Sequence, residues 1–447
     1  MKVAVIGAGI IGVTTAYELG ADGHEVTVFE RRGSVAAETS FANAGLIAPG
    51  YVTPWAAPGM PLKVLRHLFS QHAPVRVRGL PLSSLPWIWR WWRACRQPVY
   101  HANRVRMQRL AGFSRERLHE LTRSLQLEYE RGDGYLVLLR TEKDMAMAQP
   151  GLASLAELNT RFETLDAMQC RIVEPGLNTE TPLHGGIYLP NDEVGNCRQF
   201  THLLRAEAQR LGVRFRFHTT VQQIVPGTHP QLTHMCAPPH EHSTLVVNAD
   251  NLASDAQDTQ PMAEQSITEG FDAIVVCAAM ESAALLRPLG LKLPMQAVHG
   301  YSITAPLRHH EGHVDHGPRS ALMDERYKVA ISRLGNRVRV AGSAEIGGSL
   351  TRQTPGALDT LYKVLHDWFP GSAHLSQAQR WKGARPMLPD GPPVLGHSGI
   401  GGVWLNLGHG SSGWALSCGS ARLVADALAG RPPSVSIEGL GVERLAA

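Results

Sequence analysis

Three glycines and one acidic residue near the start of the chain have types and spacing suited to binding a dinucleotide. Gly7, Gly9 and Gly12 form a GxGxxG pattern, and Glu30 follows roughly 20 residues later. In such a site the first glycine makes a tight turn, the second lets backbone N–H groups approach a pyrophosphate, and the third lets a helix pack closely on a strand. The Glu30 carboxylate would accept hydrogen bonds from ribose hydroxyls. Because a carboxylate disfavours a 2′-phosphate, the pattern favours FAD or NAD over NADP.

The elements around these residues are those that such a site needs. Lys2–Ile6 is a short apolar run typical of a buried strand, residues 13–19 follow with a helical pattern, and Glu25–Phe29 is a second strand. The start of the helix would present unpaired N–H groups and the positive end of its dipole to phosphates. A GxGxxG pattern alone also occurs in structural glycine turns. The order of strand, loop, helix, strand and acid instead predicts a Rossmann-like nucleotide-binding unit.

A second glycine-rich loop lies near the end of the chain. Val403–Leu407 predicts a strand, residues 408–413 (GHGSSG) a loop, and residues 414–428 a helix that Gly430 closes. This arrangement would direct a second helix N-terminus at the cofactor, where the helix dipole favours negative charge on a reduced flavin.

The composition is that of a globular protein with two or three domains. The chain has 447 residues, of which 43% are hydrophobic and 18% are charged, which allows a large buried core. Six cysteines without a CxxC pair indicate reduced thiols and a cytoplasmic location, and they argue against a disulfide framework or a zinc site. No apolar run reaches the roughly 18 residues that predict a transmembrane helix.

Charge is segregated along the chain. No Asp or Glu occurs between Glu38 and Glu116, whereas Lys63 and a series of arginines lie in that interval. Tryptophans at positions 87, 89, 91 and 92 are interleaved with these arginines. Such a segment suits a membrane interface, where indole rings lie among headgroups and cations meet anionic lipids. The alternative is that the tryptophans pack inside a helical subdomain. Nucleic acid is not an expected partner, because no recognition motif accompanies the basic residues.

The middle of the chain predicts a second domain of α+β type. Residues 226–270 are rich in Pro, His, Asp and Gln and predict a solvated loop or a long hairpin. The histidines at positions 229, 234, 240 and 242 lack the spacing of a metal site, so no metal is expected. The other predicted elements are helices over 104–125 and 200–211, strands over 134–140, 213–217, 271–276, 327–333 and 337–341, a hairpin turn at Gly335–Asn336 and a turn at 190–196.

Several longer stretches together resemble the FAD-dependent D-amino-acid oxidase superfamily, and within it the small subunits of bacterial D-amino-acid dehydrogenases. These stretches are residues 5–19 (VIGAGIIGVTTAYEL), 39–50 (TSFANAGLIAPG), 189–204 (LPNDEVGNCRQFTHLL), 383–396 (GARPMLPDGPPVLG) and 406–430 (NLGHGSSGWALSCGSARLVADALAG). The resemblance covers nearly the whole chain in family order.

The resemblance implies an α/β fold, α+β overall, with a Rossmann-like FAD-binding domain and an antiparallel-sheet substrate domain that carries a helical insertion. The expected division assigns residues 1–50, 190–225, 270–285 and 375–447 to the FAD-binding domain, residues 51–189 and 286–374 to the substrate domain, residues 60–125 to a basic helical insertion, and residues 226–269 to the polar loop or hairpin.

The resemblance also implies roles for individual residues. Arg385 would grip a substrate carboxylate in a bidentate pair, and Tyr327, Tyr301 and His409 would line the substrate cavity. One departure from the family pattern is Ala279, which stands where a glycine is usual. The residues implied in FAD binding are Gly7, Gly9, Gly12, Glu30, Arg31, Ser40, Asn43, Ala44, Gly45, Leu46, Val221, Ala278, Gly408, Gly410, Ser411 and Gly413.

The implied reaction is the oxidation of a D-amino acid, or of a secondary amine such as hydroxyproline, to an imine. The α-hydrogen would pass as hydride to flavin N5, water would hydrolyse the imine to a 2-oxo acid, and the electrons would leave to a quinone or another carrier. The protein would then be cytoplasmic, or peripheral on the cytoplasmic face of the inner membrane. Two alternatives stay open: an oxygen-using oxidase of glycine or sarcosine oxidase type, and a flavin-binding protein without turnover.

Overall fold

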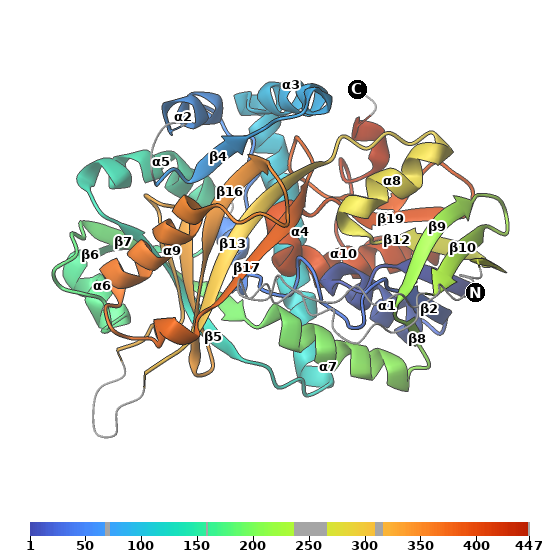
Figure 1. Cartoon of the computed structure of the whole chain (residues 1–447), viewed down its shortest axis with the longest axis horizontal. Helices are drawn as coiled ribbons and strands as arrows, with labels where there is room; N and C mark the ends of the chain where they lie inside the picture. The colour runs from blue at the N-terminus through green and yellow to red at the C-terminus, as the bar shows by residue number, and fades with distance from the viewer. Residues whose placement is uncertain (68–71, 158–159, 237–265, 309–315, 446–447) are drawn as a thin grey trace, which may run out of the picture.

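The computed structural model describes residues 1–67, 72–157, 160–236, 266–308 and 316–445. Two large sheets lie side by side, and helices pack around them (Figure 1). The six-stranded sheet takes strands from both ends of the chain, whereas most strands of the ten-stranded sheet come from its middle. This mixed architecture confirms the predicted fold class.

The six-stranded sheet is the Rossmann-like unit that the sequence predicts. Its central strand β1 (Lys2–Ile6) pairs in parallel with β2 (Glu25–Phe29) on one side and with β12 (Ala273–Val276) on the other. These strands are almost wholly buried, which explains why they are continuous apolar runs in the sequence. The remaining strands are β8 (Arg214–Arg216) beyond β2, and β19 (Val403–Leu407) and β18 (Val394–His397) beyond β12.

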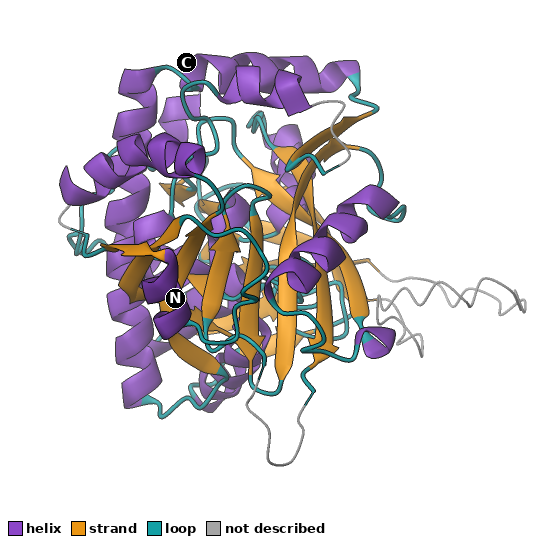
Figure 2. Cartoon of the chain, turned by 90° about the vertical axis from the view of Figure 1, so that its left-hand side faces the viewer, coloured by secondary structure: helices purple, strands orange, loops and turns teal. Residues whose placement is uncertain are grey.

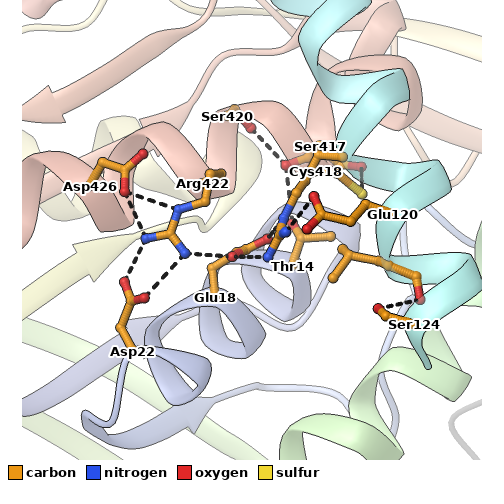
Figure 3. Close-up of polar contacts among 12 residues, drawn as sticks. Thr14, Glu18, Asp22, Glu120, Ser124, Ser417, Cys418, Ser420, Arg422 and Asp426 are labelled. Atoms are coloured by element: carbon orange, nitrogen blue, oxygen red, sulfur yellow. Dashed lines mark hydrogen bonds and ion pairs between the residues drawn. The ribbon is translucent and has the colours of Figure 1, made fainter. Parts of the chain in front are cut away.

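A buried charge network fastens three helices of this half together (Figure 3). These helices are α1 (Ile10–Ala21), α4 (Gln97–Ser124) and α10 (Gly413–Leu428), and α7 (Cys197–Arg210) also packs on α1. The Glu18 carboxylate of α1, only 1% exposed, accepts from Arg117 of α4 at 2.7 and 2.9 Å and from Arg422 of α10 at 2.8 Å. Arg422 also donates to Asp22 at 2.6 Å. The first and last long helices of the chain are thus joined through buried ion pairs.

The ten-stranded sheet forms the second half, and helices lie across it (Figure 2). One of its faces packs on α9 (Pro355–Trp368) around a second apolar core. On the opposite face, the Ser332 hydroxyl donates at 2.7 Å to the carbonyl of Ala44, in the segment that joins β2 of the six-stranded sheet to β3. Its strands in spatial order are β17 (Gln379–Met387), β13 (Gln296–Pro306), β16 (Arg337–Gly347), β15 (Val329–Leu334), β14 (Ala321–Asp324), β5 (Arg131–Leu139), β7 (Gly185–Gly195) and β3 (Leu46–Ile47), with β4 (Val75–Arg78) paired to β16 and β6 (Glu163–Asp166) paired to β7.

The predicted antiparallel hairpin is confirmed within this sheet. Strands β15 and β16 pair antiparallel around Gly335 and Asn336, and Gly335 has the positive φ of 59° that such a turn favours. The remaining helices of the chain are α2 (Met60–His67), α3 (Leu85–Ala94), α5 (Glu142–Glu157), α6 (Ala167–Val173) and α8 (Ser282–Leu286).

The tryptophans at positions 87, 89, 91 and 92 divide into a buried pair and an exposed pair. In α3, Trp87 and Trp91 are buried, and the Trp87 indole donates to the Met387 carbonyl at 3.0 Å. Trp89 and Trp92 are 57% and 54% exposed on the other side of the helix. Among the described residues, no helix combines the length and the apolar character needed to cross a membrane.

Residues 190–196, predicted as a turn, instead continue β7 up to Gly195. The pairing with β5 slips here, because Asp133 faces Glu193 and Tyr135 faces Leu189, which leaves residues 190–192 opposite Gly134 alone. The proline and polar residues therefore make a bulge inside a strand.

Three stretches that the expected division places with the FAD-binding segments pair within the ten-stranded sheet. They are residues 46–47 in β3, residues 190–195 in β7 and residues 379–387 in β17. Alternation of polar and apolar residues identifies a strand but does not tell which of the two sheets the strand pairs in.

The polar segment 226–270 contributes two arms of a hairpin-like sheet. Strand β10 (Gln231–Cys236) pairs antiparallel with β9 (Thr219–Val225) and with β11 (Ser266–Gly270). His234 of β10 is buried, and its Nε2 lies 2.8 Å from Glu269 Oε1. The histidines at 240 and 242 lie outside the described residues. Within the described ranges, no three His, Cys, Asp or Glu side chains are grouped in a way that would hold a metal ion.

Candidate functional site

A cavity of about 350 Å³ lies where the carboxyl ends of β1, β2, β12 and β19 meet the starts of α1 and α10. Gly9, Ile10 and Ile11 line it from the start of α1, and Gly413 and Trp414 line it from the start of α10. This is the edge of a parallel sheet at which α/β proteins bind ligands. Two helix N-termini therefore turn their positive ends toward one space, as the two glycine loops predict.

The three glycines of the first loop have different neighbours. Gly7 has a φ of 101°, and a Cβ there would lie 2.7 Å from the Cys277 carbonyl oxygen. A Cβ on Gly12 would lie 2.8 Å from the carbonyl carbon of Gly7 and closer still to its oxygen. A Cβ on Gly9 would meet only Ser40 Oγ, at 3.5 Å. Packing therefore requires glycine at Gly7 and Gly12, whereas Gly9 leaves its backbone open to the cavity, as a bound pyrophosphate needs.

Glu30 lines the cavity at the end of β2. Its carboxylate accepts from the Ala8 amide at 2.7 Å and from the Arg32 amide at 2.8 Å. Burial raises the pKa of Glu30 above its usual value, and the two amides oppose that shift. A carboxylate held in this way keeps lone pairs for ribose hydroxyls. Arg31 also lines the cavity and pairs with Glu38 at 2.8 Å.

The structure brings most, but not all, of the predicted cofactor residues to the cavity. Ala44 and Gly45 lead into β3, Leu46 begins it, and none of the three lines the cavity. Gly12 does not line it either, because Gly7 covers it. Ser411 lies in the short turn before α10 and is not among the lining residues. Those that line the cavity are Gly7, Gly9, Glu30, Arg31, Ser40, Asn43, Val221, Ala278, Gly408, Gly410 and Gly413.

Several lining residues were missed by the sequence analysis. Cys277 directly follows β12 and Asn406 lies near the end of β19, so both lie at the carboxyl edge of the sheet. The signal that would have found them is their place after buried parallel strands. Ala279, which departs from the glycine expected at its position, also lines the cavity, and its φ of 46° is the left-handed conformation that glycine adopts without strain.

Arg339 is a further residue that sequence reasoning missed. This guanidinium, 6% exposed, donates to Thr304 Oγ1 and to the Asn43 carbonyl, both at 2.9 Å. Burial lowers its pKa to about 10. Because Asn43 lines the cavity, Arg339 ties the cavity wall to the ten-stranded sheet.

Arg385 lies in β17 immediately before Pro386, which lines the cavity. Its guanidinium passes over Gly300 of β13, where a Cβ would lie 2.5 Å from Cζ, and donates to the Ser343 carbonyl at 3.1 Å. Burial lowers the pKa of Arg385 to about 10. In the described part of the chain, no carboxylate forms an ion pair with this side chain, so it retains donors for an anionic ligand.

The other three predicted catalytic residues do not gather beside Arg385. His409 lines the cavity but is buried, its Nε2 lies 3.0 Å from Ser420 Oγ, and burial lowers its pKa to about 3. It is therefore neutral near pH 7. Tyr301 and Tyr327 pack with the core on the α9 side of the ten-stranded sheet, away from the cavity lining. Tyr327 also precedes β15 rather than lying within it.

Residues 2–427 match the family model described as FAD dependent oxidoreductase, or DAO. The chain is a member of the FAD-dependent oxidoreductase family. FAD is therefore its cofactor, and the open backbone at Gly9, the Glu30 carboxylate and the two helix N-termini fit that group.

This FAD-dependent oxidoreductase has close relatives over its full length. It is 41% identical to a D-amino acid dehydrogenase of Cereibacter sphaeroides, covering 100% of the chain and 96% of that protein. It is 42% identical to a D-amino acid dehydrogenase of Rhizorhabdus wittichii, covering 99% and 100%. Its fold is similar to that of glycine oxidase from Geobacillus kaustophilus, with a TM-score of 0.71 and 18% identity over 98% of the chain and 97% of that structure.

Proposed function

We propose that this oxidoreductase is a D-amino-acid dehydrogenase that oxidises its substrate at the α-carbon. The names of its full-length relatives support the substrate class. The observation that carries the proposal is Arg385, which directly precedes the cavity-lining Pro386 and whose guanidinium has a carbonyl oxygen as its described hydrogen-bond partner. A substrate carboxylate would supply the counter-charge that Arg385 lacks, because planar guanidinium and carboxylate groups form two parallel hydrogen bonds.

The residues of this chain would bind and orient the substrate rather than transfer its protons. Arg385 holds the carboxylate, so that the α-carbon faces the cavity that binds FAD. His409 is neutral and bonded to Ser420, so it supplies no cation and no free base. The substrate therefore reacts with its amine unprotonated. Bound FAD supplies the acceptor for the two electrons and the α-hydrogen. The imino acid that is left adds water and releases ammonia, which yields a 2-oxo acid.

Anaerobic mixing with a panel of D- and L-amino acids tests this proposal. We expect D-amino acids to bleach the yellow absorbance of the bound flavin and their L-enantiomers to leave it. We expect Arg385→Met to raise KM for the best D-amino acid by about a hundredfold, the loss of one buried charge-assisted pair, with FAD content unchanged. A flavin that no D-amino acid bleaches would overturn the proposal.

We also propose that the electrons leave to a quinone or another carrier and not to oxygen. The relatives named dehydrogenases support this choice. Peroxide measured per turnover in air-saturated buffer tests it. A trace of peroxide is expected, whereas one peroxide per substrate would make the enzyme an oxidase.

Finally, we propose that α3 rests on an anionic membrane surface. Its exposed side carries Trp89 and Trp92, with Leu85 56% exposed and Leu82 83% exposed in the turn before it. No acidic residue lies between Glu38 and Glu116, so this segment has no negative side chain that would repel anionic headgroups. Because the six cysteines are free, we propose that the surface is the cytoplasmic face of the inner membrane.

Sedimentation with liposomes of mixed neutral and anionic lipids tests this surface. We expect Trp89→Ala/Trp92→Ala to lose most of the bound fraction. Met168→Ala/Ile172→Ala is a matched control, because these side chains are 70% and 69% exposed on α6, and it should bind as the unaltered protein does. Equal binding by the tryptophan variant would contradict the proposal.

A further inference from the structure

We propose that Glu345, Lys382 and Tyr301 form a positioning cluster that fixes the Arg385 guanidinium from the opposite face of the sheet. The inference rests on the proposed role of Arg385 in holding the substrate carboxylate. It assigns to Tyr301 a positioning role in place of the cavity-lining role that the sequence suggested.

The first part of the argument is a bulge in β16 beneath Arg385. Along the pairing of β13 with β16, His299 faces Glu345 and Tyr301 faces Gly342, so two residues of β16 lie opposite Gly300 alone. One of them, Ser343, has a φ of 55°, which is costly for a residue with a side chain. The carbonyl that accepts from Arg385 Nη1 at 3.1 Å belongs to this residue. The position of Arg385 thus depends on the bulge and on the bare backbone of Gly300.

The second part is a buried polar cluster on the other face. Lys382 Nζ lies 2.7 Å from Glu345 Oε1, and both side chains are nearly inaccessible, at 2% and 1% exposed. The Tyr301 hydroxyl donates to Glu345 Oε2 at 2.8 Å, and Thr354 donates to the same oxygen at 2.6 Å. Lys382 also donates to the Ser349 carbonyl at 2.7 Å. All three charged or phenolic groups of the cluster are therefore satisfied without water.

The two sets of contacts span the same strand from opposite faces. Strands β16 and β17 are not neighbours, because β13 runs between them. On the face opposite α9, Arg385 of β17 crosses β13 to reach Ser343 of β16. On the α9 face Lys382, three positions before Arg385, crosses β13 to reach Glu345, two positions after Ser343. Because Lys382 shares β17 with Arg385 and Glu345 shares β16 with Ser343, this ion pair holds both strands that the Arg385–Ser343 hydrogen bond joins.

The buried ion pair of Glu345 and Lys382 contributes more to the geometry of the strands than to the stability of the fold. A buried ion pair contributes little net stability compared with apolar residues of the same volume, because desolvation offsets its attraction. Its directed hydrogen bonds do, however, fix how β16 and β17 lie about β13. Displacement of a binding group by about 1 Å can cost a hundredfold in rate, so a carboxylate-binding arginine benefits from such a constraint.

The test compares holoenzyme variants in KM and kcat for D-alanine and in the competitive inhibition constant of propionate, which has the carboxylate without the amine. We expect Glu345→Gln to raise KM and the propionate constant about tenfold, with a smaller change in kcat and unchanged FAD content. Tyr301→Phe should raise KM and the propionate constant about threefold, since it removes one hydrogen bond to Glu345. Tyr51→Phe is the matched control, because its hydroxyl donates to Glu325 at 2.7 Å without contact to Arg385. It should change neither constant.

A double-mutant cycle separates positioning from general structural damage. If Glu345 acts through Arg385, Glu345→Gln should add no more than about twofold to KM once Arg385→Lys is present. The inference would be overturned if Glu345→Gln raised KM tenfold in the Arg385→Lys background as well. It would also be overturned if Glu345→Gln alone left KM and the propionate constant unaltered while Arg385→Lys raised them. Unaltered constants in Arg385→Lys alone would instead refute the proposed function. Should Glu345→Gln not fold with FAD, Tyr301→Phe decides the matter, and its equality with Tyr51→Phe would count against the cluster.

Discussion

The structure predicts opposite outcomes for two alanine substitutions three residues apart, one at Gly9 just before α1 and one at Gly12 in its first turn. A Cβ at Gly9 meets only Ser40 Oγ at 3.5 Å, an ordinary contact, and the φ of −66° there suits alanine. A Cβ at Gly12 collides with the backbone of Gly7. That backbone is held in place because the Gly7 amide donates to the Phe29 carbonyl at 2.8 Å. One substitution therefore alters the cavity, and the other alters the packing of α1 on β1.

The expected magnitudes follow from these contacts. For Gly9→Ala, the lower entropy of the unfolded chain and the weaker helix cap offset each other to within about 0.5 kcal/mol. The new methyl group would block one or two backbone N–H bonds to a phosphate, at about 1.5–3 kcal/mol each. That loss weakens FAD binding roughly a hundredfold. For Gly12→Ala, forcing the helix away from the strand costs about 1–3 kcal/mol of stability with or without FAD.

Two measurements separate these outcomes. The urea midpoint of the apoprotein, followed by tryptophan fluorescence, should stay unchanged in Gly9→Ala and fall in Gly12→Ala. Titration of apoprotein with FAD, followed by flavin fluorescence, should show the weaker binding of Gly9→Ala. The reasoning fails if Gly9→Ala binds FAD as tightly as the unaltered protein, or if its apoprotein is as unstable as that of Gly12→Ala.

Three further predictions concern stability. Glu18→Gln should lower the free energy of unfolding by about 3 kcal/mol, because Arg117 and Arg422, both partly buried, lose the charge of the buried carboxylate that they share. Urea unfolding checks this, and a loss below about 0.5 kcal/mol, typical of surface sites, would contradict it. Burial raises the pKa of Asp192 to about 7, so the folded chain keeps a proton that the unfolded chain has lost, and stability falls as pH rises from about 4 to about 7. Asp192→Asn should flatten that fall in urea midpoints measured across this range, and parallel curves would disprove the assignment. Ala279→Gly should raise stability by up to about 1 kcal/mol, because it relieves a left-handed alanine, and a lower melting temperature would refute this.

The first thirty residues show what local sequence can predict. The bounds of β1 and β2 match the predicted strands, and the glycine loop between them lines the cavity. The signal was strong because strand, turn and helix each follow from neighbouring residues. Residues 190–196 show the opposite case. Their turn composition produced a bulge, because pairing of Val194 with Leu46 and of Glu193 with Ile47 keeps the chain extended.

The predicted catalytic residues also show where local sequence is not enough. Arg385 directly precedes the cavity-lining Pro386 and its side chain crosses Gly300, whereas Tyr301, on the neighbouring strand, points to the α9 side. Alternation within a strand tells which side chains share a face, but it does not tell which face meets the cofactor half. The bulge opposite Gly300 removes even the alternation at that point. Only the assembled sheets place the two residues on opposite faces.

The six-stranded sheet has a consequence for synthesis on the ribosome. Its central strand β1 emerges first, but its neighbour β12 begins at Ala273, and β19 and α10, which complete the unit, follow only after Val403. Contacts of such long sequence separation form slowly. Strand β1 can pair early with β2, but it lacks its other neighbour until residues 273–276 have been translated. During that interval its unpaired edge and apolar side chains are exposed to aggregation, which chaperones prevent.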